Sequence, residues 1–569
     1  MIGKILNKTT TSISAAAFIL GGSVLVSRVL GLLRDRILAG MFGAGTELDV
    51  YFSAFRIPDL IYSIIIGGAI SSAFIPVFIS HFTKNEKEAW KVAGSFFYIA
   101  AIGLFGITSI VFFAMPLIVP LVVPGFDTEN QAITITMSRI MLLSPLFLGL
   151  SAVFSGILHS FKKFFVYSLA PIFYNIGIII GAVYFTPKFG VEGLAWGVAL
   201  GAFLHMAVQA PVSFRSGFHL VSIKDIYHPA INRILKLMAP RAVGLAAYQV
   251  NLWVITAIAS TLAAGSLTVF TLANNIHYLP IGIVGLSFAT ALFPNLSHSI
   301  SEGRYKEYIG ELSRTLRSVL FLVMPMSILF FVLRAHIVRV VLGTGQFSWE
   351  DTRLTAAALG AFSIGIFAYA LSPIISKAFY AKENTITPVI ASTIGMVTNV
   401  FLSVLLIFVV FPRDGILRML ARLFKIENLP DVAVIGLPVA FSISGIVSML
   451  LLFWFFFKED ERNKMLVSDM LRGFVRVSVA SLAAGVVGWS TLQIFAYFLG
   501  PIDTFILIFT QAGFATLMAF AIYFIIGYTL HFEEFRVIIS MIRAKLNKEG
   551  IEEQAPLERV ESHAVEEEI

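Results

Sequence analysis

The chain has 569 residues, of which 57% are hydrophobic and 13% charged, and its mean hydropathy is +0.87. Soluble globular chains are about 25% charged, so this composition excludes a set of soluble domains and indicates a polytopic membrane protein. The chain has no cysteine, which excludes disulfides, thiolate metal sites and cysteine nucleophiles, and its formal net charge is +7.

Hydrophobic runs predict about fourteen membrane spans along the chain. The runs are too long for the strands of a barrel, and lipid cannot satisfy free backbone groups, so helices are expected. The predicted fold class is therefore an all-α polytopic membrane protein. The candidate spans cover residues 13–40, 49–80, 92–122, 131–158, 165–186, 192–213, 237–263, 266–297, 315–342, 354–376, 386–411, 432–457, 471–499 and 503–530.

Lys and Arg residues concentrate on one side of these spans. With the N-terminus inside, inner segments such as 84–91, 215–233 and 458–464 are rich in them, whereas the outer loops at 41–48 and 123–130 contain none. Because positively charged loops favour the cytoplasmic side, both termini are predicted to be cytoplasmic.

One predicted outer segment, 413–429, departs from this distribution. It carries Arg413, Arg418, Arg422 and Lys425, and its apolar residues recur at helical spacing. This pattern predicts an amphipathic helix lying on the outer surface. The helix would either anchor the protein against lipid phosphates or take part in handling a substrate.

An internal repeat relates the two halves of the chain at an offset of 218 to 220 positions. Six spans separate the copies, so both halves have the same orientation in the membrane. We predict two pseudo-symmetric six-helix lobes, 1–222 and 223–464, followed by two further helices in 465–531. Two such lobes normally enclose a site that opens to each side in turn, which favours a transporter over a membrane enzyme or a channel. The paired segments are 44–46 with 264–266, 72–76 with 290–294, and Lys162 with Lys382.

Several ionisable residues fall inside the predicted spans, where a charge is costly and usually faces a cavity or a partner. Arg28 would lie about 18 Å from the outer end of its helix, too deep to reach either headgroup layer easily. It would either form a structural ion pair with Asp59 or line a polar cavity. The other ionisable residues of these spans are Arg34, Asp35 and Arg36 in the first, Asp49 and Arg56 in the second, Arg139 in the fourth and Arg241 in the seventh.

A cavity rich in arginine favours an anionic substrate. Guanidinium groups match phosphate and carboxylate, so a diphosphate would find suitable partners there. An exporter of cationic drugs would instead need exposed carboxylates, yet Asp35, Asp49 and Asp59 all have arginine neighbours in the sequence.

Sequence motifs that extend over nearly the whole chain, to about residue 530, point to one family. They are Ser27-Arg28-Val29-Leu30-Gly31-Leu32-Leu33-Arg34-Asp35, Phe42-Gly43-Ala44-Gly45, Asp49, Ala54-Phe55-Arg56-Ile57-Pro58, Gly156-Ile157-Leu158, Ala170-Pro171, Asn175, Phe379-Tyr380-Ala381 and Thr385-x-Thr387-Pro388. This set resembles the MurJ (MviN) family of lipid II flippases.

The resemblance implies the multidrug/oligosaccharidyl-lipid/polysaccharide exporter fold in a bacterial cytoplasmic membrane. It implies transport, rather than catalysis, of lipid II, a disaccharide-pentapeptide on undecaprenyl diphosphate, from the inner to the outer leaflet by alternating access. The headgroup would occupy a polar cavity, and the lipid tail a groove beside the last two helices. No cofactor is expected, and membrane potential, a proton or a sodium ion would supply the energy. Anionic lipids and cell-wall synthesis proteins are further expected partners, and nucleic acid is not.

The resemblance also assigns site residues. Arg28, Arg34 and Asp35 match charged family positions in the first helix, and Asp49 matches an acidic position in the second. The chain departs from the family at Tyr62, Gly67 and Asn275, where arginine, glutamate and arginine are expected, and we hypothesise that Arg56 and Arg241 compensate. The predicted substrate-binding residues are Arg28, Arg34, Asp35, Asp49, Arg56, Arg241 and Asn275.

Three alternative functions stay open: a flippase for another polyprenyl-diphosphate-linked glycan, a small-molecule exporter of the same fold, and a scaffold for wall-synthesis enzymes that transports nothing. A cytoplasmic tail is predicted over 532–569, and its segment 549–569, with eight Glu and one Arg, is expected to be disordered. Without that segment the chain has 40 basic and 26 acidic residues, a net charge of +14. This excess fits a membrane surface and an anionic substrate.

Overall fold

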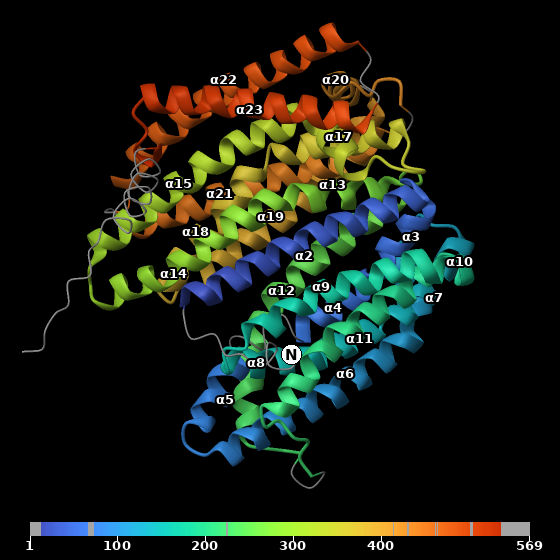
Figure 1. The fold of residues 1–569 in the computed structure, drawn as a ribbon, viewed down its shortest axis with the longest axis vertical. Helices are drawn as coiled ribbons and strands as arrows, with labels where there is room; N and C mark the ends of the chain where they lie inside the picture. Colours follow the sequence, from blue (N-terminus) through green and yellow to red (C-terminus); the bar gives the residue numbers. More distant parts are fainter. Residues whose placement is uncertain are drawn as a thin grey trace, which may run out of the picture.

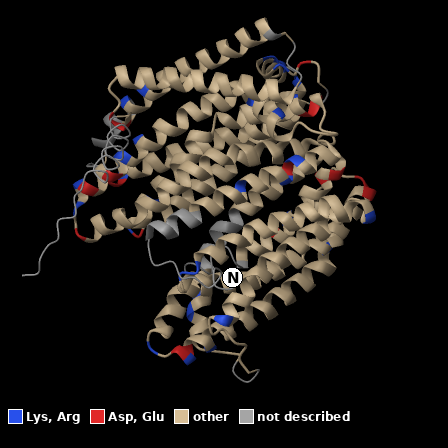
Figure 2. Cartoon of the chain, viewed as in Figure 1, with Lys and Arg blue, Asp and Glu red and all other residues tan. Residues whose placement is uncertain are grey.

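The computed structural model describes residues 13–65, 73–222, 226–413, 415–429, 432–460, 463, 465–500 and 504–535. Within these ranges every regular element is a helix, as the composition predicts (Figure 1). Most charged residues lie near the ends of the helices, and a group on the first long helix is the main exception (Figure 2). Gly67 and the acidic segment 549–569 lie outside the described residues.

The first lobe forms one bundle in the lower part of Figure 1. Several of its long apolar helices contain internal prolines, and one continues into a π-helical turn. The elements are α2 (Ile13–Phe42), α3 (Thr46–Ala54), α4 (Arg56–Ile65), α5 (Ile75–Phe82), α6 (Glu86–Val122), α7 (Thr128–Met141), α8 (Leu143–Ser160), α9 (Phe164–Ile180), η2 (Gly181–Phe185), α10 (Thr186–Phe189) and α11 (Glu192–Arg215).

The second lobe lies above the first in this view, and a pair of C-terminal helices covers it (Figure 1). Its elements are α12 (Ala230–Ser260), α13 (Ser266–Pro280), η4 (Ile281–Gly285), α14 (Leu286–Ser301), α15 (Tyr305–Val332), α16 (Arg334–Leu342), α17 (Trp349–Ser363), α18 (Ile366–Ala381), α19 (Ile386–Val404), η5 (Leu405–Val410), η6 (Phe411–Arg413), α20 (Gly415–Phe424), η7 (Val432–Ile435) and α21 (Gly436–Glu459). The C-terminal pair is α22 (Met465–Leu499) and α23 (Phe505–Thr529).

The number of membrane spans can be compared with the prediction over the described residues. Ten helices are long and apolar enough to cross a membrane, and the bent pair α17–α18 makes an eleventh span. All eleven coincide with predicted spans. The other three predicted spans correspond to α2, to α3–α5 and to α12. The exact number of fourteen therefore stays a prediction, while the multi-pass helical class is confirmed.

The predicted repeat is visible in unusual backbone positions. Lys162 and Glu383, which follow α8 and α18, both have a positive φ, 55° and 60°. Such values are uncommon for residues other than glycine, so their recurrence 221 positions apart indicates the same local structure in each lobe. The breaks between α7 and α8 and between α17 and α18 also correspond. These recurrences agree with the predicted repeat, and the division into two related lobes stays a prediction.

The two lobes are joined at the end of the molecule where α2 stops, which we call the Gly43 end. The amide of Gln346 donates to the carbonyl of Gly40 at 2.8 Å, and Gly125 donates to Oγ of Ser260 at 3.1 Å. Gly265, with φ of 88°, approaches the carbonyl of Ala44 so closely that a Cβ would lie 2.0 Å from its oxygen. At Gly125 and Gly265 the backbones of the two lobes meet too closely for a larger side chain, and these contacts close this end between the lobes.

Helix α12 contacts both lobes rather than belonging to the second alone. Ile231 and Ile234, near its start, pack in an aromatic cluster with α5 and α6. Further along, Gln249 donates to Ser63 of α4 at 2.7 Å, and Asn251 accepts from Asn399 of α19 at 3.1 Å. α12 therefore bridges the predicted boundary between lobes at residue 223.

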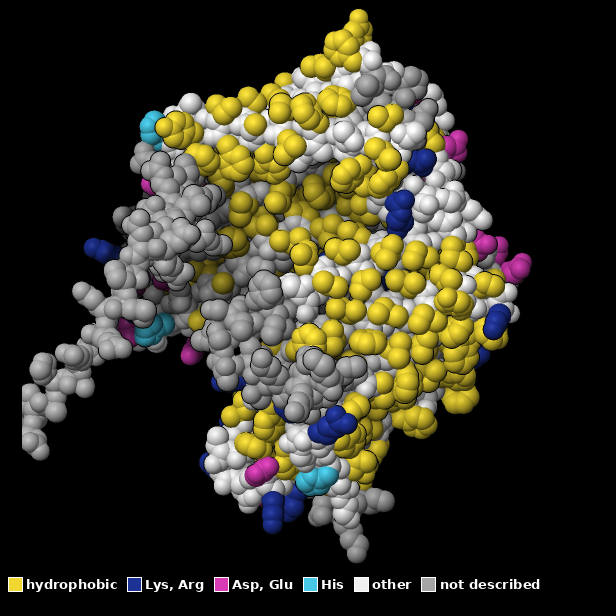
Figure 3. Space-filling model, viewed as in Figure 1, with side chains coloured by type: hydrophobic (Ala, Val, Ile, Leu, Met, Phe, Trp, Pro, Cys, Tyr) yellow, Lys and Arg dark blue, Asp and Glu magenta, His cyan; other side chains and the backbone are white. Residues whose placement is uncertain are grey.

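Two features lie at the edge of the second lobe. Helix α20 falls inside the predicted amphipathic segment, and Phe424 at its end is buried against Gly360 while Met419 and Leu423 are exposed. Helices α22 and α23 pack on each other and on α15. Figure 3 shows a recess between α23 and α2 on this face, with mostly hydrophobic side chains in view.

Candidate substrate cavity between the two lobes

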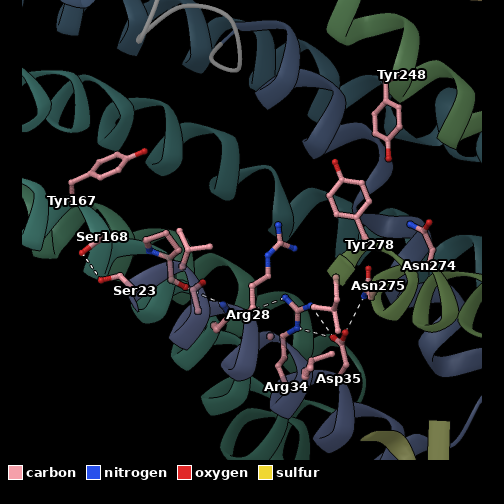
Figure 4. Close-up of a pocket in the computed structure, with 17 residues that line it drawn as sticks. Ser23, Arg28, Arg34, Asp35, Tyr167, Ser168, Tyr248, Asn274, Asn275 and Tyr278 are labelled. Atoms are coloured by element: carbon pink, nitrogen blue, oxygen red, sulfur yellow. Dashed lines mark hydrogen bonds and ion pairs between the residues drawn. The ribbon is translucent and has the colours of Figure 1, made fainter. Parts of the chain in front are cut away.

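A cavity of about 550 Å³ lies between α2 and α9 of the first lobe and α12 and α13 of the second. The cavity lies further from the Gly43 end than the contacts that join the lobes there. The α2 residues that line it all precede position 36. We call it the interlobe cavity (Figure 4). Its polar lining comprises Ser23, Ser27, Arg28, Arg34 and Asp35 of α2, Tyr167, Ser168 and Asn175 of α9, Tyr248 of α12, and Asn274, Asn275 and Tyr278 of α13.

Arg34 and Asp35 form the centre of a hydrogen-bonded network at the inner wall of this cavity (Figure 4). Nη2 and Nε of Arg34 donate to Oδ1 of Asp35 at 2.8 and 3.0 Å, and its Nη1 donates to Oδ1 of Asn175 at 3.2 Å. Asn275 donates through Nδ2 to Oδ2 of Asp35 at 2.9 Å. Asp35 is only 3% exposed, so this network joins the lobes with its charges paired.

Arg28 lies nearly two turns earlier on α2 and differs from Arg34 in its surroundings. Its guanidinium carbon is 5.8 Å from the centre of the Tyr278 ring, a cation–π contact across the cavity. Within the described residues it has no carboxylate partner, and the alternative ion pair with Asp59 is not formed. Arg28 is therefore the basic group of the cavity that can take an anion without breaking an existing ion pair.

Asp49 does not line the cavity, although it was predicted to bind substrate. It is 2% exposed, and its carboxylate caps the start of α13 in the other lobe. It accepts from the amides of Gly265 and Thr268, both at 2.7 Å, and from Oγ1 of Thr268 at 2.6 Å. A carboxylate at a helix N-terminus is stabilised by the free amides and the helix dipole. Asp49 therefore contacts the other lobe rather than the lining of the interlobe cavity.

Arg56 also lies at the boundary between lobes and outside the cavity lining. Its Nε donates to Oγ1 of Thr256 on α12 at 2.7 Å, and Asp59 lies one turn further along α4. The predicted compensation by Arg56 for a missing cavity charge is therefore not seen as a lining contact. Arg241 lies in α12, and its side chain is outside the described residues.

The departures from the family have different surroundings. Tyr62 packs in an apolar cluster with residues of α6, α7 and α8, so it brings no charge to the cavity. Asn275 replaces an expected arginine and donates to Asp35, a neutral contact where an arginine would have added a second charge. Gly67 lies outside the described residues.

The cavity contains polar residues that the sequence did not single out. Tyr248 and Tyr278 enter from α12 and α13, and Oδ1 of Asn274 is buried there without a hydrogen-bond partner (Figure 4). Their only signal was the presence of amide and phenol groups inside predicted spans seven and eight. No group of three or more His, Asp or Glu residues within the described ranges could hold a metal ion.

Comparison with known proteins identifies the family. The sequence model described as "Lipid II flippase MurJ" matches residues 38–511, which is well over half of the chain. The chain belongs to the MurJ family. A MurJ relative from Rhizobium tropici, named a probable lipid II flippase, is 32% identical over 406 residues, which cover 70% of this chain and 76% of the relative.

Solved structures agree with the MurJ assignment. A structure of lipid II flippase MurJ in an inward closed conformation superimposes with a TM-score of 0.70 at 25% identity, over 92% of this chain and all of that one. An inward-facing multidrug transporter of the MATE family matches with a TM-score of 0.62 at 16% identity, over 78% and 96% of the two chains, which shows a shared fold. The exporter fold implied by the MurJ motifs is thus confirmed.

The matched MurJ range begins at residue 38, after Arg28, Arg34 and Asp35. Their assignment to the site rests on the structure, because all three line the interlobe cavity together with Asn175 and Asn275. Of the seven predicted MurJ site residues, four line the interlobe cavity: Arg28, Arg34, Asp35 and Asn275.

Proposed function

We propose that this MurJ-family protein is a transporter that moves lipid II from the inner to the outer leaflet of the bacterial cytoplasmic membrane by alternating access. The observation that carries the proposal is Arg28 in the interlobe cavity, a guanidinium with no carboxylate partner among the described residues. A diphosphate that enters the membrane loses the water bound to its oxygens, and hydrogen bonds from groups such as a guanidinium must replace that water.

The distribution of Lys and Arg supports an orientation for this cycle. The Gly43 end carries few basic loops, so we assign it to the outer side, with both termini in the cytoplasm. The contacts of Asp49 with Gly265 and of Gly40 with Gln346 would then close the outer side. The cavity would accept the headgroup from the inner leaflet, and separation of these contacts would release it outward, driven by membrane potential or a coupled cation.

The lipid tail needs an apolar path beside the polar cavity. The recess between α23 and α2 supports such a path, because its visible side chains are mostly hydrophobic (Figure 3). The guanidinium of Arg36 lies 5.5 Å from the Phe505 ring, which places α2 beside the start of α23. We propose that the undecaprenyl chain follows this recess while the headgroup occupies the cavity.

The test is replacement of Arg28 by alanine in a bacterium that depends on this protein. A hydrogen bond to a charged group contributes about 1.5–3 kcal/mol, so Arg28→Ala should lower translocation by about tenfold or more. The strain should fail to grow while the protein still accumulates in the membrane.

Arg139→Ala is the matched control. Arg139 is an intramembrane arginine that contacts the Phe112 carbonyl and ring and lies outside the interlobe cavity. This control should grow normally. Normal growth with Arg28→Ala would contradict the proposed role, and translocation by purified protein in liposomes excludes a scaffold that transports nothing.

A further inference from the structure

A second cavity, of about 450 Å³, lies wholly within the second lobe. Its walls come from α12, α13, η4, α14, α18, α19 and α21, so no helix of the first lobe contributes to it. We call it the second-lobe cavity. None of the predicted substrate-binding residues lines it.

The chemistry of this cavity differs from that of the interlobe cavity. Its lining has no arginine and no carboxylate among the described residues, and Lys377 is its one charged lining residue. Hydroxyl, amide and aromatic groups predominate. The polar neutral groups are Tyr248, Asn251, Tyr278, Tyr369, Ser372, Ser376, Tyr380, Ser392, Asn399, Ser444 and Ser448.

The two cavities share part of their lining. Tyr248 and Tyr278 line both, and their side chains lie on the same side of the interlobe cavity in Figure 4. Arg28 lies on the far side of this pair, in cation–π contact with Tyr278. A single elongated ligand could therefore extend from the charged cavity past the two tyrosines into the neutral one.

Buried polar groups in the second-lobe cavity lack partners. Asn399 is 1% exposed and donates to Asn251 at 3.1 Å, but its own Oδ1 accepts no hydrogen bond from the described residues. His277 is also 1% exposed, and neither ring nitrogen has a partner among them. Unpaired buried polar atoms are costly, and a small adjustment of the cavity wall would let a ligand with hydroxyl and amide groups satisfy them.

Aromatic surfaces complete the site. The ring of Tyr369 stacks on Phe441 with centres 4.7 Å apart, and its hydroxyl donates to the Phe441 carbonyl at 3.0 Å, so this ring is fixed. Ligand sites commonly combine apolar rings with a few placed polar groups. Rigid rings beside uncharged amides and hydroxyls suit an uncharged, hydroxyl-rich group, whereas a phosphate would find no guanidinium in the described lining.

We propose that the second-lobe cavity binds the saccharide part of the lipid-linked headgroup, while Arg28 in the interlobe cavity holds the diphosphate. The inference rests on the proposed function and adds a division of the headgroup between two cavities. The two tyrosines lie where the saccharide joins the diphosphate. The second-lobe cavity thereby sets specificity for the sugar, and the interlobe cavity provides affinity for the charge.

The experiment compares the binding of two ligands to the full chain in lipid nanodiscs. Lipid II carries the saccharide, whereas undecaprenyl diphosphate carries the charge and tail alone. Ser448→Leu and Ser392→Leu each place a larger apolar side chain on the cavity wall. Ser448 is half-buried and Ser392 is exposed. Each should weaken lipid II binding about tenfold and leave undecaprenyl diphosphate binding unchanged within about twofold.

Two controls separate this inference from the proposed function. Ser109→Leu changes a serine in α6 that lines neither cavity, and it should alter neither affinity. Arg28→Ala should weaken both ligands. The inference is overturned if the two cavity variants weaken both ligands equally or affect neither. Failure of the unaltered protein to bind lipid II would instead overturn the proposed function.

Discussion

At the scale of single residues, the charges of α2 that line the interlobe cavity divide into two kinds. Arg34 and Asp35 are committed to each other and to Asn175 and Asn275, which joins the lobes through a satisfied network. Arg28 has no carboxylate partner among the described residues and faces the cavity. The same helix thus carries a structural ion pair, Arg34 with Asp35, and in Arg28 the group that we propose binds the anion.

Removing one member of this pair should be costly. Asp35→Ala leaves the partly exposed Arg34 without its charge partner and Asn275 without its acceptor, so we expect a loss of about 1–3 kcal/mol in the free energy of unfolding. Thermal unfolding of the purified protein should show a clearly lower midpoint. The double variant Arg34→Leu, Asp35→Leu removes both charges and should recover much of that loss. A midpoint for Asp35→Ala equal to that of the unaltered protein would show that the pair does not hold the lobes together.

How far the sequence predicts the site also follows from these residues. Arg28 and Asp35 are seven positions apart, a spacing that places them on one helix face, and both line the cavity. Asp49 could not be placed this way, because its partners Gly265 and Thr268 are more than 200 positions distant. Tyr248 and Tyr278 gave no signal beyond a phenol group inside a predicted span, since their place in the cavity depends on how the two lobes meet.

At the scale of elements, glycine decides how closely helices approach. Gly177 and Gly181 on α9 and η2 face Gly201 and Gly197 on α11. A Cβ on Gly181 would lie 2.3 Å from the Cα of Gly197, a separation that real atoms do not reach. Small residues that let backbones touch are a common means of packing membrane helices. The hydropathy of the sequence predicts both spans. It does not predict that the two helices touch, because hydropathy does not tell which helix faces meet.

This contact gives a prediction for the helix pair. Gly197→Val should separate α11 from η2, because a Cβ on Gly197 would already lie 2.6 Å from the Cα of Gly181. We expect overpacking of about 1–3 kcal/mol or more and reduced accumulation of folded protein in the membrane.

Gly103→Val in α6 is the control for this change, because no described atom would lie within 4 Å of a Cβ at position 103. Fluorescence size-exclusion of detergent extracts would measure folded protein for both variants. Equal yields of the two would show that the close contact of α9 and α11 is not required.

At the scale of the whole molecule, the internal repeat is related to the contacts that close the Gly43 end between the lobes. Asp49 and Thr268 lie 219 positions apart, within the 218 to 220 offset of the repeat, and they form a hydrogen bond where the lobes meet. Corresponding positions of the two copies therefore meet at the Gly43 end, as expected near an axis that relates them. The sequence predicts two lobes in parallel orientation, and the contact between Asp49 and Thr268 agrees with that prediction. The sequence could not predict which end is closed, because that depends on contacts between the copies.

Passage of the headgroup between the lobes requires the Gly43 end to open in each transport cycle. A Cβ on Gly40 would lie 2.6 Å from Cγ2 of Thr344, so Gly40→Cys with Thr344→Cys brings two thiols within disulfide reach. The chain has no other cysteine, so within one molecule the bond can form only between these two.

The decisive experiment follows translocation of fluorescent lipid II in liposomes that contain this double variant, before oxidation, after oxidation and after reduction. Each single-cysteine variant serves as its control and should be insensitive to oxidation. We predict that translocation stops when the disulfide forms and returns when it is reduced. Undiminished translocation with the Gly43 end locked would contradict passage between the two lobes.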